Sequence, residues 1–193
     1  HGKFRRQRQM CIRDRPKQQQ LGIIGGETIR SVSMRILATF ILSASLVSTG
    51  ASAFDSEHLK QLKETNACSK CDLSDADLSD LDLAKAKINR TNLSGANLSG
   101  ANLMFANLVG SRFIGANMTE INLSAANASG ANLKGANLTD AKLIRSRLRG
   151  ANLAETDLTG ANMKGANLSD ISQDKAIFCN TIMSDGRVER SGC

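Results

Sequence analysis

Residues 91–110 read Thr-Asn-Leu-Ser-Gly, Ala-Asn-Leu-Ser-Gly, Ala-Asn-Leu-Met-Phe and Ala-Asn-Leu-Val-Gly, which are four variants of one five-residue unit. The unit recurs from residue 71 to residue 170 without a slip in phase and so makes twenty copies. We call its central residue, such as Leu93, position i. Nineteen of the twenty residues at i are large and apolar, eighteen at i−2 are small, sixteen at i−1 are Asn or Asp, and nine at i+2 are Gly. Such a period indicates a repeat architecture, in which each unit buries its apolar side chains against its neighbours.

Neither an α-helix nor a plain β-strand brings every fifth residue to the same side. Fifth residues lie about 140° apart around a helix, and they alternate between the two faces of a strand. Three extended residues followed by a two-residue corner meet the requirement, because i−2 and i then point inward while i−1 points outward. The pattern therefore predicts an all-β solenoid with a narrow interior of Leu and Ala. An aromatic content of only 3% is consistent with that interior.

The Ala-Asn-Leu-Ser-Gly and Ala-Asn-Leu-Lys-Gly units resemble the A(D/N)LXX motif of pentapeptide-repeat proteins. The resemblance covers residues 71–170 and implies a right-handed quadrilateral β-helix with four pentapeptides per coil. Twenty repeats would then make about five coils, which stand about 24 Å tall at the usual inter-strand spacing. Exported members of the family also resemble this chain at both ends, with Cys-x-x-Cys-Asp-Leu before the repeats and Phe-Cys…Asp-Gly…Cys after them.

The segment before the first cap has the pattern of an export signal. Residues 34–53 combine a short basic start, an apolar run of about a dozen residues and Ala51-Ser52-Ala53, as in a secretory signal peptide. A membrane anchor is the alternative, but the run is shorter than the roughly 20 residues that span a bilayer. We expect cleavage near Ala53 and no membrane span afterwards. Residues 1–33 fit neither pattern and are interpreted as a disordered, non-native leader, with a genuine basic arm as the alternative.

Caps are expected on both sides of the repeats, because the open edges of a sheet invite aggregation. Residues 54–70 contain good helix formers, and Leu59 and Leu62 give them one apolar stripe. They predict a short N-terminal α-helical cap over the first coil. Residues 171–193 stay near the repeat phase only at first, since Gln173 breaks it. We therefore expect them to form an irregular C-terminal cap loop.

Four cysteines lie outside residues 1–53: Cys68, Cys71, Cys179 and Cys193. An even number in an exported chain suggests disulfides, and four cysteines allow three connectivities. The pairs Cys68–Cys71 and Cys179–Cys193 are favoured, because the two ends of a five-coil rod are too far apart to be bridged. For Cys68 and Cys71, separate reduced thiols and a redox or metal-binding role remain as alternatives.

The positive net charge belongs to the N-terminal region and not to the repeats. Residues 1–53 contain nine Lys and Arg against two Asp and Glu, whereas residues 54–193 contain sixteen of each. The chain also has no Trp or Tyr on which nucleic-acid bases could stack. We expect no nucleic-acid partner.

No motif of the sequence predicts catalysis or a cofactor. There is no glycine-rich phosphate loop, HExxH or GxSxG, and His58 in the expected cap helix is interpreted as a surface residue. Five aspartates between residues 72 and 82 could suggest calcium, but the period sends them to different faces and no EF-hand spacing is present. We interpret them as a solvated acidic first coil. The expectation is no catalytic residue, no metal and no cofactor.

A coil of twenty residues would sort the outward charges onto opposite faces of the rod. The face of Leu78 displays acids without Lys or Arg, namely Asp77, Asp80, Glu120, Asp140 and Asp157. The opposite face displays Asp170 and four cations, namely Lys87, Arg90, Arg147 and Arg149. Four apolar residues at outward positions are expected around one corner, as a contact patch or as partly buried side chains: Met104, Phe105, Val109 and Ile114. We interpret these residues as candidate surfaces for an unknown protein partner or for self-association, with solvation of the rod as the alternative.

The sequence therefore predicts a non-enzymatic scaffold or protein-interaction module in the periplasm of a bacterium or outside the cell. The alternative is a DNA mimic that binds a topoisomerase, because some pentapeptide-repeat proteins resemble B-form DNA and protect DNA gyrase against quinolones. That alternative requires a strongly acidic surface and a cytoplasmic location. Residues 71–170 hold ten acids and ten bases, and a signal-peptide pattern precedes them. Both observations disfavour the DNA mimic.

Overall fold

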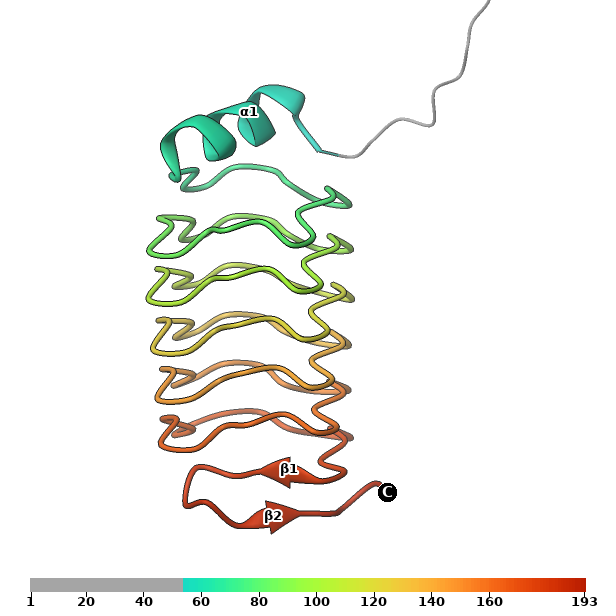
Figure 1. Cartoon of the computed structure of the whole chain (residues 1–193). Coiled ribbons are helices and arrows are strands. Elements are labelled where there is room, and N and C mark those ends of the chain that lie inside the picture. The colour runs from blue at the N-terminus through green and yellow to red at the C-terminus, as the bar shows by residue number, and fades with distance from the viewer. Residues whose placement is uncertain (1–53) are drawn as a thin grey trace, which may run out of the picture. The chain divides into compact units, whose positions relative to one another are not determined.

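The computed structural model describes residues 54–193. They form a solenoid of stacked coils with helix α1 (Ser56–Thr65) at one end (Figure 1). Two short strands, β1 (Thr181–Ile182) and β2 (Val188–Glu189), lie at the other end. The leader and signal peptide that we predicted lie outside the described residues. Within residues 54–193, no helix has the length and the apolar character needed to cross a membrane.

Twenty residues make one coil. Residues at i−1 form parallel bridges with residues twenty positions further along the chain, from the Ala67–Lys87 pair to the Asn162–Ile182 pair. Since a coil holds four five-residue units, the solenoid has four faces. We number them by the residue at position i in the first coil: face 1 (Leu73), face 2 (Leu78), face 3 (Leu83) and face 4 (Ile88).

Backbone hydrogen bonds tie each coil to both of its neighbours. The N–H at i donates towards the C-terminal end, as Leu98 does to the carbonyl of Asn117 (2.7 Å). The N–H at i−1 donates towards the N-terminal end, as Asn97 does to the carbonyl of Ala76 (3.0 Å). Each repeat thus adds a few rungs to four parallel ladders, and few backbone groups are left unpaired in the dry interior.

The corners explain why Gly recurs at i+2. All twenty residues at this position have a positive φ, between 56° and 71°. That conformation costs an L-residue roughly 1–2 kcal/mol and costs Gly nothing comparable. Nine corners use Gly, and the other eleven bear the strain.

The Asn or Asp at i−1 holds the following corner in place. Its side-chain oxygen accepts a hydrogen bond from the backbone N–H of residue i+1, as Asn97 Oδ1 does from Ser99 (3.3 Å). The hydroxyl of Ser99 donates to the same oxygen (2.9 Å). This is an Asx turn, which Asn and Asp favour because their short side chains reach the backbone two residues on. It satisfies the N–H that the ladders leave free.

The interior contains the residues that the period selects. From Leu73 to Met163, every residue at i is at most 3% exposed. Four of the five buried hydroxyl residues at i−2 donate to a backbone carbonyl of the preceding coil, as Thr156 Oγ1 does to Leu133 (2.9 Å), and only the hydroxyl of Ser146 has no partner within residues 54–193. The narrow space therefore admits Thr in place of Ala without leaving that hydroxyl unpaired.

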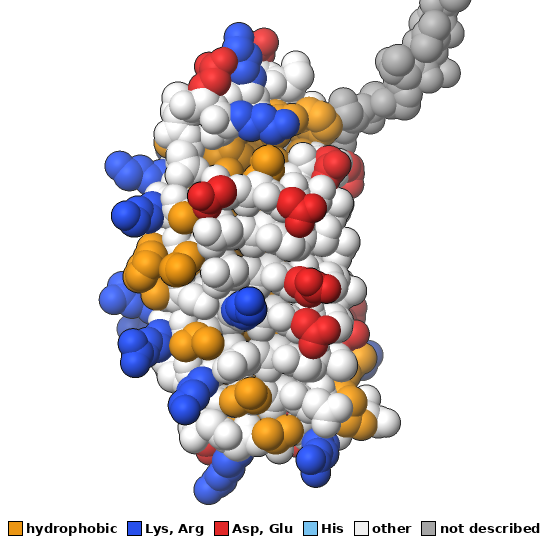
Figure 2. All heavy atoms as spheres, viewed as in Figure 1, with side chains coloured by type: hydrophobic (Ala, Val, Ile, Leu, Met, Phe, Trp, Pro, Cys, Tyr) orange, Lys and Arg blue, Asp and Glu red, His pale blue; other side chains and the backbone are white. Residues whose placement is uncertain are grey.

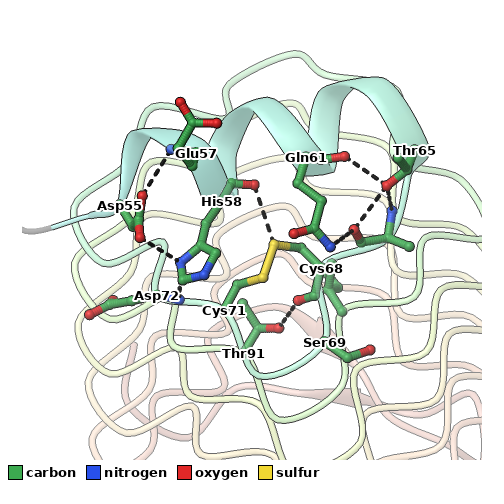
Figure 3. Close-up of a disulfide and its surroundings, with 12 residues drawn as sticks. Asp55, Glu57, His58, Gln61, Thr65, Cys68, Ser69, Cys71, Asp72 and Thr91 are labelled. Atoms are coloured by element: carbon green, nitrogen blue, oxygen red, sulfur yellow. Dashed lines mark hydrogen bonds and ion pairs between the residues drawn. A yellow bond between two sulfur atoms is a disulfide. The ribbon is translucent and has the colours of Figure 1, made fainter.

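Helix α1 lies against the first coil (Figure 3). Asp55 caps its N-terminus by accepting a hydrogen bond from Glu57 N–H (2.9 Å), and Asn66 ends it in a left-handed conformation. Leu62 is fully buried against the coil. His58 Nδ1 accepts a hydrogen bond from the backbone N–H of Asp72 (3.2 Å), which joins the helix to face 1.

The structure contains two disulfides, and they are the two pairs that the sequence favoured. Cys68–Cys71 lies under α1, where Cys68 takes position i and is fully buried, with its Sγ 3.3 Å from the carbonyl oxygen of His58 (Figure 3). Cys179–Cys193 joins the last coil to the end of the chain. One disulfide thus replaces packing inside the tube, and the other closes a loop outside it.

The expected boundaries of the solenoid were too narrow, and residues 171–193 are not simply an irregular loop. Ser172, Ile177 and Ile182 still bridge to the preceding coil, so the bridged region spans almost six coils instead of five. The pattern recovers after the exposed Gln173, because Phe178 fills position i and Thr181 fills i−2, both buried. Thr181 begins β1, which pairs with β2 as an antiparallel hairpin.

Candidate interaction surfaces

The five acidic residues singled out in the sequence all lie on face 2. They occupy positions i−1 or i+2 of coils that are stacked by the twenty-residue bridges, and no Lys or Arg shares the face. Four of them are exposed and Asp157 is half-buried. The face therefore presents a single sign of charge over four coil spacings, about 19 Å.

Hydrogen bonds hold the carboxylate of Asp77 in its charged form. The hydroxyl of Ser79 (2.7 Å) and its backbone N–H (3.2 Å) both donate to Asp77 Oδ1, and they lower the pKa of this carboxyl below its ordinary value. On face 1, the hydroxyl and N–H of Ser74 lower the pKa of Asp72 in the same way. Where the residue at i−1 is Asp, the Asx turn that shapes the corner thus also favours the ionised form of that Asp.

Two acids at the corner of face 2 lie over glycines of the next coil. A Cβ added to Gly100 would approach Asp80 Oδ1 to 2.2 Å, and one added to Gly160 would approach Asp140 Oδ1 to 2.1 Å. These glycines therefore serve two needs, a positive φ and space for a carboxylate. The sequence signal for this contact is an acid at i+2 followed by Gly twenty residues later. We missed it in the sequence, because we treated these glycines only as turn residues.

Face 4 carries the four cations that the sequence assigned to it. Lys87, Arg90 and Arg147 form no ion pair with another residue between 54 and 193. Arg149 differs, because its Nε lies 3.2 Å from Asp170 Oδ2 at the C-terminal end of the same face. Faces 2 and 4 are opposite sides of a four-sided solenoid, so the described part of the molecule is polarised across its width.

The prediction that four apolar residues gather around one corner is wrong. Five residues advance the chain by one face, so Met104 and Phe105 lie between faces 3 and 4, Val109 between faces 4 and 1, and Ile114 between faces 1 and 2. Three of these side chains are half-buried, as the alternative interpretation held, and only Phe105 is largely exposed, at 59%. The four residues therefore form no common patch.

The corner between faces 3 and 4 has a feature that the sequence reasoning missed. Its i+1 and i+2 positions include three cations and three large apolar residues but no Asp or Glu, and we call the column of these six residues the basic corner: Lys85, Met104, Phe105, Ile144, Arg145 and Lys164. Figure 2 shows Lys and Arg side chains gathered along one long edge of the solenoid, with hydrophobic side chains among them, and Asp and Glu towards the other edge. The signal was present at a spacing of twenty residues, but it appears only when corners are compared as well as faces.

The described residues contain no cluster that suggests metal chemistry. In residues 54–193, no three His, Cys, Asp or Glu side chains come together in a way that could hold a metal ion. The aspartates between residues 72 and 82 fall on three successive faces of the first coil, as their spacing requires.

Comparisons with known proteins agree with this architecture. A family model described as pentapeptide repeats (8 copies) matches residues 68–103, 101–140 and 136–171, which together exceed half of the chain. No curated protein matches the chain.

Solved structures show the same fold. The crystal structure of the pentapeptide repeat protein Rfr23 from the cyanobacterium Cyanothece 51142 is 29% identical, with a TM-score of 0.60, and the match covers 66% of this chain and 97% of that chain. A pentapeptide repeat protein from the thylakoid lumen of Arabidopsis thaliana is 32% identical, with a TM-score of 0.50, over 51% of this chain and 69% of that chain. These neighbours imply a right-handed quadrilateral β-helix.

Proposed function

Because the chain belongs to the pentapeptide repeat family, we propose that it is a non-enzymatic, exported scaffold that binds a protein partner through the charged faces of its solenoid. The observation that carries the proposal is the opposite sign of faces 2 and 4. A solenoid repeats its outward positions at a fixed spacing, which suits it to extended contacts with other proteins. Self-association of two copies, with face 2 of one against face 4 of the other, uses the same charges.

The export part of the proposal is supported by the two disulfides and by the signal-peptide pattern of residues 34–53. Structural disulfides form and persist mainly in oxidising compartments, including the bacterial periplasm. We expect the stable protein to begin at Phe54 and to be periplasmic or secreted. N-terminal sequencing of the protein from fractionated cells tests this expectation, and a cytoplasmic product that retains Met34 would overturn it.

We propose that residues 54–70 and 171–193 act as caps. On the N-terminal side, Asn66 Nδ2 donates to the carbonyl of Ala84 (2.8 Å), and His58 accepts from Asp72, so backbone groups of the first coil find partners in this segment. At the other end, the N–H of Phe178 donates to the carbonyl of Ser191 (3.0 Å). Occupied edges limit end-to-end pairing with other chains, which would leave the lateral faces for binding.

Charge reversal on face 4 tests the scaffold proposal. Lys87 and Arg147 are the suitable pair, because both lie at i−1 and neither is paired within residues 54–193, whereas Arg149 is already bound to Asp170. The variant Lys87→Glu/Arg147→Glu should weaken both self-association and capture of periplasmic proteins. The difference should be larger at low salt than at physiological salt, where exposed charges are screened beyond about 8 Å.

The matched control is Arg112→Glu/Lys142→Glu, which changes the net charge equally at the same repeat position on faces 1 and 3. Sedimentation velocity and affinity capture, each at two salt concentrations, give the readout. If the face 4 variant behaves like the parent protein, or no differently from the control, the charges serve only to solvate the rod and the proposal fails.

A further inference from the structure

The basic corner combines charge and apolar surface in a way that no other corner of the described solenoid does. Lys85, Arg145 and Lys164 are exposed and form no ion pair with any residue from 54 to 193. Phe105 lies between Lys85 and Arg145 in the stack and is 59% exposed, and Met104 and Ile144 of the same column are half-buried. From Lys85 to Lys164 the column spans about four coils, or about 19 Å.

Phe105 is the least expected residue of this column. It has a φ of 60° at position i+2, where nine of the twenty repeats have Gly. The other ten non-Gly residues at i+2 share this conformation, but nine of them are charged and the tenth is Ala125. Phe105 is therefore the one large apolar side chain at i+2 of the twenty repeats, and its exposure points to a contact outside the chain.

The partner must supply negative charge and an apolar environment together. Face 2 of a second copy supplies the charge, but from Asp77 to Gly160 its other outward residues are Asn, Ser, Thr and Gly, so its acidic part offers no apolar contact for Phe105. The column also lies on a convex edge of the solenoid. A convex edge fits against a broad, deformable surface more readily than into a pocket of fixed shape. An anionic bilayer meets both requirements, because its phosphates attract Lys and Arg and its interface accepts aromatic rings.

We propose that the basic corner docks on the surface of an anionic lipid bilayer. Phe105 enters the boundary between headgroups and acyl chains, and Lys85, Arg145 and Lys164 bind lipid phosphates on either side of it. Lys87 and Arg147 on face 4 and Lys142 on face 3 add to the attraction from the adjoining faces, since all three are exposed and unpaired within residues 54–193. This membrane contact goes beyond the scaffold function and leaves the acidic face 2 free.

A tryptophan reporter tests the orientation directly, because the chain contains no Trp and no Tyr. The full chain with Phe105→Trp is mixed with vesicles of phosphatidylcholine containing about a third phosphatidylglycerol. We expect a blue shift of its emission and quenching by brominated lipid. The control is Ile114→Trp, at the diagonally opposite corner between faces 1 and 2, where we expect neither change. A local reporter is needed because residues 1–53 carry nine Lys and Arg and could attach the chain to vesicles by themselves.

Charge removal in the same background completes the test. Adding Lys85→Gln, Arg145→Gln and Lys164→Gln to Phe105→Trp should weaken the vesicle-induced shift about a hundredfold in lipid concentration, at about fivefold per charge. Vesicles of pure phosphatidylcholine should leave the emission unchanged. An unchanged Phe105→Trp emission, an equal response of Ile114→Trp, or an undiminished response of the Gln variant would overturn the proposal. So would an equal response to soluble polyglutamate, which would assign the corner to an acidic protein.

Discussion

Phe105 and Phe113 lie eight residues apart on successive coils of the solenoid, one outside and the other inside. Phe113 occupies position i and is fully buried, whereas Phe105 occupies i+2 and is 59% exposed. Inside, any large apolar side chain satisfies the repeat, and Leu is the commonest. Outside, the positions vary between Gly, Asp, Lys, Arg and Phe without a change in the backbone. The interior therefore determines the fold, and the corners and outward faces are free to carry the binding properties.

Replacing the two phenylalanines with Ala should give the largest difference in the free energy of unfolding between an inward and an outward position. Phe113→Ala leaves a cavity in a closely packed tube and should lower the free energy of unfolding by about 3–5 kcal/mol. Phe105→Ala keeps a side chain in the same strained conformation and should change it by less than about 0.5 kcal/mol. Urea unfolding of both variants measures the difference. Similar losses would mean that the structure assigns the wrong phase to the third coil.

The disulfides extend the comparison to the C-terminal end. Cys179→Ser/Cys193→Ser removes a bridge outside the tube with a sequence separation of 14. In the chain-entropy account a loop of this size contributes about 3 kcal/mol. We expect a loss of that order, together with faster amide exchange in residues 183–193 and unchanged protection around Phe113. Identical melting curves for the parent and the variant under oxidising conditions would show that the bridge does not stabilise the fold.

The stability cost of replacing a corner Gly with Ala should depend on the atoms that the added Cβ would meet. Gly135→Ala meets no atom within 4 Å and should cost only the strain of a positive φ, roughly 1–2 kcal/mol. Gly160→Ala should cost more, because its Cβ would meet the carboxylate of Asp140. In an Asp140→Ala background the two substitutions should cost the same. A difference that persists there would exclude the carboxylate contact as its cause.

Acid should destabilise the solenoid partly through Asp72 and Asp77. Their pKa values are lowered by hydrogen bonds from Ser74 and Ser79, so their stabilising effect is present above the unfolded pKa of about 3.9 and is lost as the pH falls through the lower folded values. Asp72→Asn/Asp77→Asn keeps the turn acceptors. It should lower the melting temperature slightly at pH 7, because the hydrogen bonds to a carboxylate become neutral ones, and it should reduce the decline in melting temperature between about pH 5 and pH 2. Parallel declines in the parent and the variant would contradict the assignment.

The interior of the fold was predictable from the sequence because it depends on one period. Leu73 to Met163 are buried as that period requires, whereas the twenty-residue coil followed from the family resemblance and not from the period. The ends were less predictable, since the exposed Gln173 conceals the continuation through Phe178 and Thr181.

The surfaces were predictable only in part. Counting by twenty correctly grouped the charges of faces 2 and 4. It could not show that Arg149 pairs with Asp170, that Asp140 lies over Gly160, or that Phe105 is far more exposed than Ile114. These properties depend on side-chain reach and local packing, which no spacing rule contains.

The separation of interior from exterior is tested most directly by placing one carboxylate on each side of face 2. Leu138→Asp puts an unpaired charge into the dry interior, where its burial is severely penalised, and this variant should show no cooperative melting above room temperature. Ser99→Asp puts the same group at a half-buried corner, where only the hydrogen bond of the Ser99 hydroxyl to Asn97 is lost, and it should lower the free energy of unfolding by about 1 kcal/mol. Thermal melts of the two variants beside the parent protein decide the matter. Equal shifts in melting temperature would contradict the assignment of inward and outward positions on which the account depends.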